Sequence, residues 1–196
     1  MRRLLLLVML GALAEPALAQ TVTSIDTELV KGRCRFIADD GEVGHYALKR
    51  CPGLAGARVY TVAGVNKVSL SFRWGKAKAE DVVEDYSIGD KLEWRGIRGK
   101  QGLKPHAAIV RIIVKDHEKD ERHNVWGVIR MEPRNACLMA VIDEAANPDA
   151  ITLARTTADA EAPNLACAKN KTKIVGTASR WAQEVIGLDG DPPAPQ

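Results

Sequence analysis

Four cysteines restrict this chain more than any other feature, because each disulfide ties two segments together. They stand at Cys34, Cys51, Cys137 and Cys167. An even number of cysteines in an exported chain is typical of disulfides, although four cysteines allow three connectivities. The segments between the cysteines indicate which connectivity forms.

Cys34 and Cys51 lie symmetrically about a turn-like stretch, residues 39–44 (DDGEVG). A hairpin folded at this stretch would bring the two cysteines side by side. The stretch lacks the alternating oxygen ligands and the distal glutamate of a calcium-binding loop, so a tight turn explains it. We therefore predict a disulfide between Cys34 and Cys51.

The segment between Cys137 and Cys167 is predicted to run away from Cys137 as a strand and back towards it as a helix. Residues 138–142 are typical of a strand and would rise roughly 20 Å at about 3.3 Å per residue. Asn147 then suits a helix N-cap, with Pro148 in the first turn. A helix from Pro148 to Ala162 would return roughly 22 Å at about 1.5 Å per residue, before a proline ends it. We predict a second disulfide between Cys137 and Cys167.

Residues 1–19 have the pattern of a signal peptide. Arg2 and Arg3 precede the apolar residues 4–13, and residues 17–19 (ALA) match the small-x-small site that a signal peptidase cleaves. No apolar run reaches the length of about 20 residues that a membrane helix needs, so we expect no transmembrane segment in the mature chain. The predicted location is the bacterial periplasm or the secreted fraction.

The rest of the chain suits one domain, residues 20–188, since domains cluster near 100 to 150 residues. Residues 189–196 cannot bury enough apolar surface to become ordered, and we expect a disordered tail. Hairpin-like pairs of apolar segments predict a mostly antiparallel sheet. These pairs are residues 58–62 with 67–73, 92–97 with 107–114, and 124–131 with 136–142.

The predicted fold class is therefore α+β, with one main C-terminal helix and two disulfides. Alanines at helical spacing from 150 to 162 indicate a narrow face that packs on the sheet, and the face with Arg155, Asp159 and Glu161 is expected to be solvated. A shorter helix is predicted over residues 179–186. Residues 78–86 suit either a helix or a loop.

Catalytic chemistry finds little support in the sequence. His45 and His106 could act as bases for a cysteine nucleophile, but we expect all four thiols to be oxidised. No G-x-S-x-G motif is present, and Ser69 and Ser71 lie inside a predicted strand. We therefore predict no catalytic residue and no cofactor.

A polar cluster over residues 116–123 (DHEKDERH) contains two histidines and four carboxylates. Such side chains could bind zinc or manganese. The cluster lacks H-E-x-x-H spacing, its Lys119 and Arg122 oppose a cation, and it falls where a turn should join two strands. We interpret it as a solvated loop and predict no metal site.

The basic stretch from Lys91 to Arg111 is the most suggestive surface feature. In a hairpin its charges would gather on the wet face and the tip, where they could attract phosphate or carboxylate groups. The alternative is an ordinary solvated face. The predicted anion-binding or partner-binding residues are Arg95, Arg98, Lys100 and Lys104. The expected partner is an acidic polymer of the cell envelope or a protein.

Nucleic acid is not expected as a partner. Without Arg2, Arg3 and Glu15, the chain has 26 basic and 24 acidic residues, a net charge near +2. This near balance gives no global attraction to a polyanion such as DNA.

Two stretches of the chain resemble an uncharacterised family of small exported proteobacterial proteins with two disulfides. The first is residues 51–56 (CPGLAG), followed by Val59 and Tyr60, and the second is residues 137–143 (CLMAVID), followed by residues 146–150 (ANPDA). The resemblance implies a periplasmic location and the same two bridges. It implies no activity and no catalytic residue.

These features favour a non-enzymatic binding or accessory protein of the cell envelope. One alternative is a periplasmic hydrolase inhibitor, which would project a rigid anchor from a loop. The other is an unrecognised hydrolase or metal enzyme, which would need a concave pocket with converging His, Asp or Glu side chains.

Overall fold

A computed structural model describes residues 21–30, 32–38, 46–64, 68–76, 80–116 and 118–187. The predicted signal peptide (1–19), the predicted tail (189–196) and the predicted turn at 39–44 lie outside the described residues. His45 and His117 also lie outside them. Among the described residues, no helix is long and apolar enough to cross a membrane.

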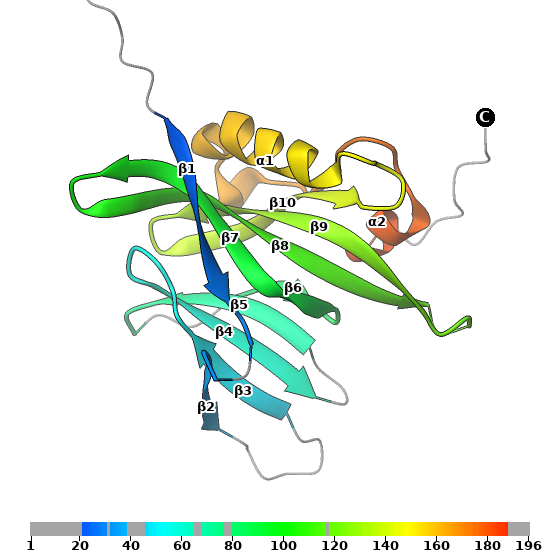
Figure 1. The fold of residues 1–196 in the computed structure, drawn as a ribbon, viewed down its shortest axis with the longest axis horizontal. Helices are drawn as coiled ribbons and strands as arrows, with labels where there is room; N and C mark the ends of the chain where they lie inside the picture. The colour runs from blue at the N-terminus through cyan, green and yellow to red at the C-terminus, as the bar shows by residue number, and fades with distance from the viewer. Residues whose placement is uncertain are drawn as a thin grey trace, which may run out of the picture.

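The described strands form two sheets (Figure 1). The first sheet has the order β1 (Val22–Glu28), β7 (Ser87–Gly99), β8 (Gly102–Asp116), β9 (Glu121–Glu132), β10 (Asn135–Asp143), β11 (Lys173–Ile174). The second sheet has the order β2 (Arg35–Ala38), β3 (Tyr46–Cys51), β4 (Ala57–Gly64), β5 (Val68–Trp74), β6 (Glu80–Glu84). All paired strands are antiparallel except β10 and β11, which are parallel.

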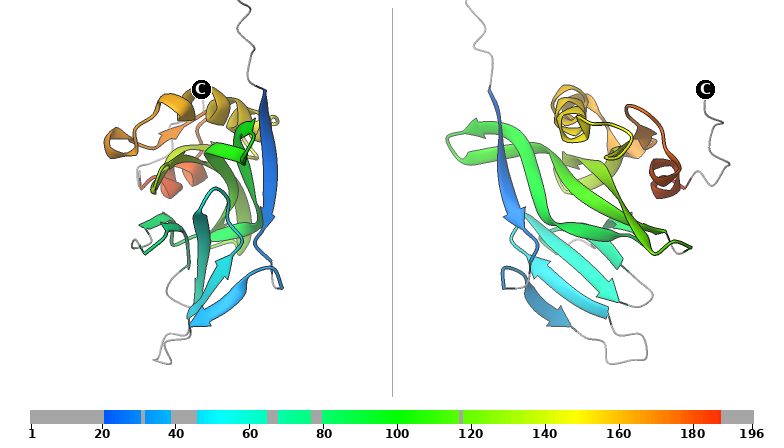
Figure 2. Two further views of the ribbon diagram at one scale, coloured as in Figure 1. Left: turned by 90° about the vertical axis from the view of Figure 1, so that its left-hand side faces the viewer. Right: turned by 45° about the vertical axis from the view of Figure 1, so that its right-hand side comes forward.

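Helix α1 (Ala150–Glu161) covers one face of the first sheet, and the second sheet lies beyond the opposite face (Figures 1 and 2). Ala150, Ala154 and Ala158 are buried in one cluster with Ile109 and Val128 of the sheet. Because alanine is small, the helix axis can approach the strands closely. The predicted helix over Pro148–Ala162 is thus confirmed, with a start at Ala150 and a continuation into the 3₁₀ turn η1 (Ala162–Asn164). The predicted N-cap Asn147 is wrong: Asp149 precedes the helix, and the Asn147 side chain bonds the backbone of Asp143 and Thr177 instead.

The main apolar core lies between the two sheets. Trp94 of β7 is fully buried there, and its ring meets the edge of Phe72 of β5 at a centroid distance of 5.8 Å. The Trp94 indole Nε1–H donates a hydrogen bond of 2.8 Å to Thr27 Oγ1. Since strand side chains alternate between faces, Glu93 and Arg95 point to the α1 side of the sheet.

Both predicted disulfides are confirmed. Cys34 joins Cys51. Arg35 pairs with Arg50 in the antiparallel β2–β3 ladder, so Cys34, directly before Arg35, lies opposite Cys51, directly after Arg50. Cys137 of β10 joins Cys167, the first residue of the 3₁₀ turn η2 (Cys167–Lys169). The second bridge fastens the segment after α1 to the sheet that α1 covers.

The mostly antiparallel β structure with one main helix is also confirmed, but the strands form two sheets and not the single sheet predicted. The short helix predicted over residues 179–186 is α2 (Arg180–Val185), with Ser179 Oγ accepting a hydrogen bond of 3.2 Å from Ala182 N. The prediction of helix or loop over residues 78–86 is wrong for the stretch that forms β6. Pairing with β5 makes this polar stretch, EDVVE, an edge strand.

Candidate functional site

A cavity of about 600 Å³ opens beside the tip-proximal part of the β7–β8 hairpin, where Ile97 pairs with Lys104. Residues of β4, β5, β8, β9 and α1 line it. Leu54, Trp74 and Met131 contribute to an apolar wall. The ionisable lining residues are Lys104, His106, Arg130, Glu132 and Asp159. The cavity therefore combines an apolar surface with convergent charged groups, as ligand sites commonly do.

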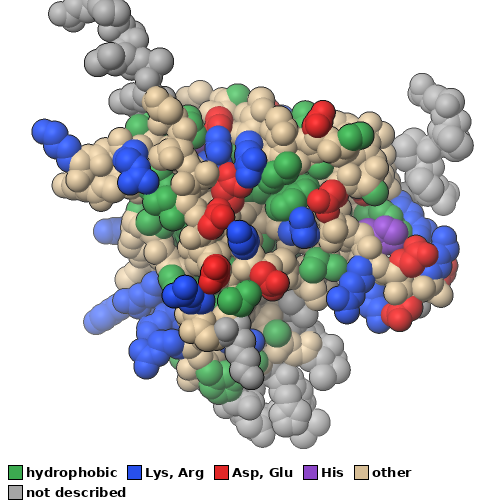
Figure 3. Space-filling view, in the orientation of Figure 1, with side chains coloured by type: hydrophobic (Ala, Val, Ile, Leu, Met, Phe, Trp, Pro, Cys, Tyr) green, Lys and Arg blue, Asp and Glu red, His purple; other side chains and the backbone are tan. Residues whose placement is uncertain are grey.

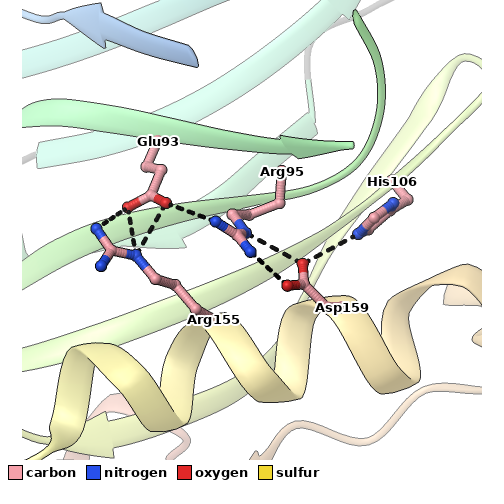
Figure 4. A network of polar contacts seen from close by, with 5 residues as sticks. All are labelled: Glu93, Arg95, His106, Arg155 and Asp159. Carbon is pink, nitrogen blue, oxygen red and sulfur yellow. Dashed lines mark hydrogen bonds and ion pairs between the residues drawn. The ribbon is translucent and has the colours of Figure 1, made fainter. Parts of the chain in front are cut away.

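Beside the cavity, five side chains form an ion-pair network (Figure 4). Arg95 of β7 donates to both carboxylate oxygens of Asp159 on α1, from Nε to Oδ1 at 3.1 Å and from Nη2 to Oδ2. Arg95 Nη1 also donates to Glu93 Oε1 at 3.3 Å. Arg155, one turn before Asp159, donates to both oxygens of Glu93 at 2.9 to 3.1 Å. The network bonds α1 to the sheet through charged groups.

The solvation expected for Asp159 is wrong, because its carboxylate is only 26% exposed and receives Arg95. Arg95 itself is 14% exposed. The hydrogen bonds from Arg95 to Asp159 outweigh burial and raise the pKa of Arg95. The sequence contained both residues but not their contact, since nothing local shows which strand α1 covers.

The structure therefore separates Arg95 from the other three predicted anion-binding residues. Arg98, Lys100 and Lys104 are exposed around the tip of the β7–β8 hairpin, whereas Arg95 lies under α1 with two carboxylates. Lys104 also lines the cavity. Of the four residues, it alone belongs to both the hairpin surface and the cavity lining.

His106 adjoins the network and lines the cavity. The residue is 9% exposed, and its Nε2 lies 3.4 Å from Asp159 Oδ1 without a hydrogen-bonding geometry. Burial lowers the pKa of His106; Asp159 opposes this effect, and the nearby Arg130 and Arg95 reinforce it. The imidazole is therefore neutral at pH 7.

This lowered pKa predicts a loss of stability in weak acid. The unfolded chain binds the proton more readily than the folded chain, so the contribution of neutral His106 is complete above its ordinary pKa of about 6.5 and is lost as the pH falls below that value. We expect His106→Gln to lack this part of the pH dependence. Urea unfolding of the parent and of His106→Gln at about pH 7.5 and about pH 5 measures the free energy of unfolding at each pH. If both proteins lose the same free energy between the two pH values, His106 does not cause the loss.

Arg130 is the second cation of the cavity, and sequence reasoning did not single it out. Its guanidinium donates to three backbone carbonyls: to Leu165 and His106 at 3.1 Å, and to Pro163 at 3.5 Å. Among the described residues, neither Arg130 nor Lys104 forms an ion pair with a carboxylate.

The two carboxylates of the cavity lining already have partners. Glu132 accepts a hydrogen bond of 2.9 Å from Cys167 N, and Asp159 is bound to Arg95. With both acids engaged and both cations lacking a carboxylate, the cavity lining favours an anionic group over a cationic one.

The polar cluster over residues 116–123 brings three potential metal ligands together. One atom each of Asp116, Glu121 and His123 lie within 4.8 Å of one another. Both oxygens of Asp116 already have partners, since Oδ1 accepts from Glu118 N and Lys119 N, and Oδ2 accepts from Arg180 at 2.7 Å. Burial raises the pKa of Asp116, but these N–H bonds and Arg180 together hold it below its usual value.

Aromatic stacking completes this cluster. The His123 ring stacks on Trp181 of α2 at a centroid distance of 3.9 Å, and the Arg180 guanidinium lies 3.8 Å from the Trp181 ring. These contacts fasten α2 to the β8–β9 hairpin, which is a structural role. The absence of a metal site stays a prediction, to be tested with zinc or manganese and the melting temperature.

No protein-family model matches the chain, and no characterised protein and no solved structure is significantly similar to it. The function therefore has to be inferred from the geometry of the site. The cavity and its two cations are the features that offer a specific chemistry.

Proposed function

We propose that this chain is an exported, non-enzymatic binding protein of the cell envelope, whose cavity takes a small ligand with an apolar body and an anionic group. The cavity carries the proposal, because one wall is apolar and the ionisable groups without a carboxylate partner, Lys104 and Arg130, are cations. Two disulfides among the described residues support export, since such bonds persist in oxidising compartments.

The hairpin adds a means of attracting the ligand. Arg98 and Lys100 are exposed at its tip, and Lys104 lies between this tip and the cavity. Exposed charges of one sign raise the local concentration of an oppositely charged ligand, and salt screens this effect. Binding should therefore weaken as salt increases.

An enzyme remains the second candidate, because His106, Asp159 and Glu132 converge on one concave site. The engagement of both carboxylates argues against general acid–base catalysis by them. The described lining also contains no serine, threonine or cysteine that could act as a nucleophile. These observations favour binding over turnover.

A pair of related dyes tests the proposal. Anilinonaphthalene sulfonate carries an aromatic body with an anionic group, and N-phenylnaphthylamine is its neutral counterpart. We expect saturable binding of the sulfonate with the larger affinity, because Lys104 and Arg130 contribute charge-assisted hydrogen bonds. Lys104→Gln should weaken sulfonate binding about tenfold, since one such bond contributes about 1.5 kcal/mol or more. Fluorescence titration measures both affinities.

Lys100→Gln is the matched control, because it removes the same charge from the same hairpin but does not line the cavity. We expect it to change sulfonate affinity less than about twofold, as a distant screened charge should. Equal effects of the two substitutions, or equal affinities for the two dyes, would refute an anion-selective cavity.

A further inference from the structure

The second sheet presents four arginines on one face. Arg35 of β2 pairs with Arg50 of β3, which in turn pairs with Tyr60 of β4. Arg58 precedes Tyr60 by two residues and pairs with Arg73 of β5. Since residues two apart on a strand, and residues directly opposite across a ladder, share a face, all four arginines lie on the same face.

This face points away from the first sheet. The alternate residues of β4 and β5, including Val59, Leu70 and Phe72, are buried in the core between the sheets. Figure 3 shows Lys and Arg side chains gathered at the lower left of the molecule, over the second sheet. The arginine face consists of Arg35, Arg50, Arg58 and Arg73, and the three intervals from β2 to β5 span about 14 Å at about 4.8 Å per strand. Arg35 and Arg58 are exposed, whereas Arg50 and Arg73 are partly buried. Tyr60 and Ser71, which lie on the same face, are buried.

The arginine face is not neutralised within the described structure. No ion pair between described residues joins any of its four guanidiniums to a carboxylate. Both cross-strand pairs, Arg35 with Arg50 and Arg58 with Arg73, place like charges directly opposite, which destabilises a sheet. The acidic side chains Asp81 and Glu84 of the neighbouring edge strand β6 share this face, opposite Ser71 and Ser69 of β5, but in the described part of the chain no ion pair joins them to the four arginines. A partner with several anionic groups would relieve this repulsion.

Next to this charge lie two exposed apolar side chains. Phe36 is 58% exposed and Ile37 is 45% exposed, and they are the exposed large hydrophobic residues of the described chain. Both belong to the edge strand β2, directly after Arg35. Strand alternation places Phe36 on the face opposite Arg35, and a β-bulge between Phe36 and Ala38 interrupts the alternation at Ile37. The two side chains therefore lie along the sheet edge that borders the arginine face. Large apolar side chains that stay exposed beside a charged surface often mark an interaction site.

We propose that the arginine face and the edge strand β2 bind the surface of a membrane that contains anionic phospholipids. Guanidinium groups bind phosphate oxygens in a bidentate manner, and several basic residues together are attracted to a negative lipid surface. Phe36 and Ile37 would enter the interfacial layer, because peripheral binding depends on buried apolar area as well as charge. A dissolved polyanion would use the arginines but would leave Phe36 and Ile37 in water.

Vesicle cosedimentation tests the charge requirement. The purified protein should sediment with vesicles of phosphatidylglycerol and phosphatidylcholine but not with phosphatidylcholine alone, and added salt should release it. The triple variant Arg35→Gln, Arg50→Gln and Arg58→Gln should bind the anionic vesicles about 100-fold more weakly, which is about fivefold for each basic residue. Its melting temperature should not fall, since the substitutions remove like-charge contacts.

The matched control removes the same charge from exposed residues of the first sheet and its hairpin that do not line the cavity: Arg98→Gln, Lys100→Gln and Arg122→Gln. We expect this control to retain vesicle binding within about threefold, since only long-range attraction changes. An equal loss of vesicle binding in both triple variants would overturn the proposal, because the net charge of the protein would then explain the binding without the arginine face. Vesicle binding by the arginine variant as strong as that of the parent would overturn it as well.

Phe36→Ser with Ile37→Ser tests the apolar requirement and distinguishes a membrane from a dissolved polyanion. We expect at least a tenfold loss of vesicle binding, because two interfacial side chains no longer bury apolar area. Binding to soluble polyphosphate should not change. A variant that keeps full vesicle binding would overturn the membrane proposal and assign the arginine face to soluble polyanions. Circular dichroism of each variant verifies the fold.

Discussion

Replacing Cys137 and Cys167 together by Ala should lower the free energy of unfolding by about 3.5 kcal/mol. The bridge closes a loop with a sequence separation of 30 residues, and its loss frees the unfolded chain to sample many more conformations. The native state also depends on this bridge, because it fastens the segment after α1 to β10. Urea unfolding, followed by the fluorescence of the tryptophans, measures the change.

The other bridge provides the comparison. Cys34 and Cys51 are separated by 17 residues, so their joint replacement by Ala should cost about 3 kcal/mol, slightly less than the longer loop. Peptide mapping without reductant should recover the same two pairs. A link between Cys34 and Cys137, or a loss below about 1 kcal/mol for either double variant, would contradict this account.

Replacing Asp159 by Asn should cost about 2 to 3 kcal/mol, because it leaves a charged and largely buried Arg95 without its bidentate partner. The Arg95 side chain is only 14% exposed, so water cannot fully replace the lost carboxylate. Arg155→Gln is the matched control within the same network. Its side chain is 46% exposed, and its largely buried partner Glu93 keeps Arg95 as a second cation, so we expect a cost of about 1 kcal/mol.

After Asp159→Asn, Glu93 is the remaining carboxylate partner of Arg95, and a double variant distinguishes the loss of the second carboxylate from lost packing. Replacing Arg95 and Asp159 together by Leu removes both charges, so it should be less destabilising than Asp159→Asn alone. Chemical denaturation of the three variants measures the difference. If Asp159→Asn and Arg155→Gln lower the free energy of unfolding by the same amount, burial does not strengthen the Arg95–Asp159 ion pair, and the role assigned to Asp159 is wrong.

Sequence reasoning succeeded where neighbouring residues decide the structure. The spacing of Cys34 and Cys51 about a turn, and the strand and helix between Cys137 and Cys167, were sufficient to predict both bridges. Runs of apolar residues located β8, β9 and β10, and Pro163 marked the end of α1. The predicted N-cap was wrong, because the Asn147 side chain bonds Thr177 and Asp149 precedes the helix. The prediction of helix or loop was wrong for residues 80–84, because pairing with β5, and not their own sequence, makes them an edge strand.

The candidate site depended on contacts between distant segments. Asp159 was expected in solvent, yet it binds Arg95, which precedes it by 64 residues. Nothing in the sequence of either element shows which strands α1 covers, because an alanine face can pack on many strands. The cavity lining, drawn from both sheets and α1, was therefore not predicted from the sequence.

The sequence by itself determined the two bridges, helix α1 and the three main hairpins, since each rests on residue spacing or on a short contiguous pattern. The tertiary structure alone decided which charges are neutralised and which are not. Arg95 and Arg58 are both strand arginines flanked by apolar residues, but Arg95 lies under a helix that carries Asp159, and Arg58 lies opposite Arg73. A charge acquires its function from its neighbours in space, and strand pairing and helix placement fix those neighbours across long sequence separations.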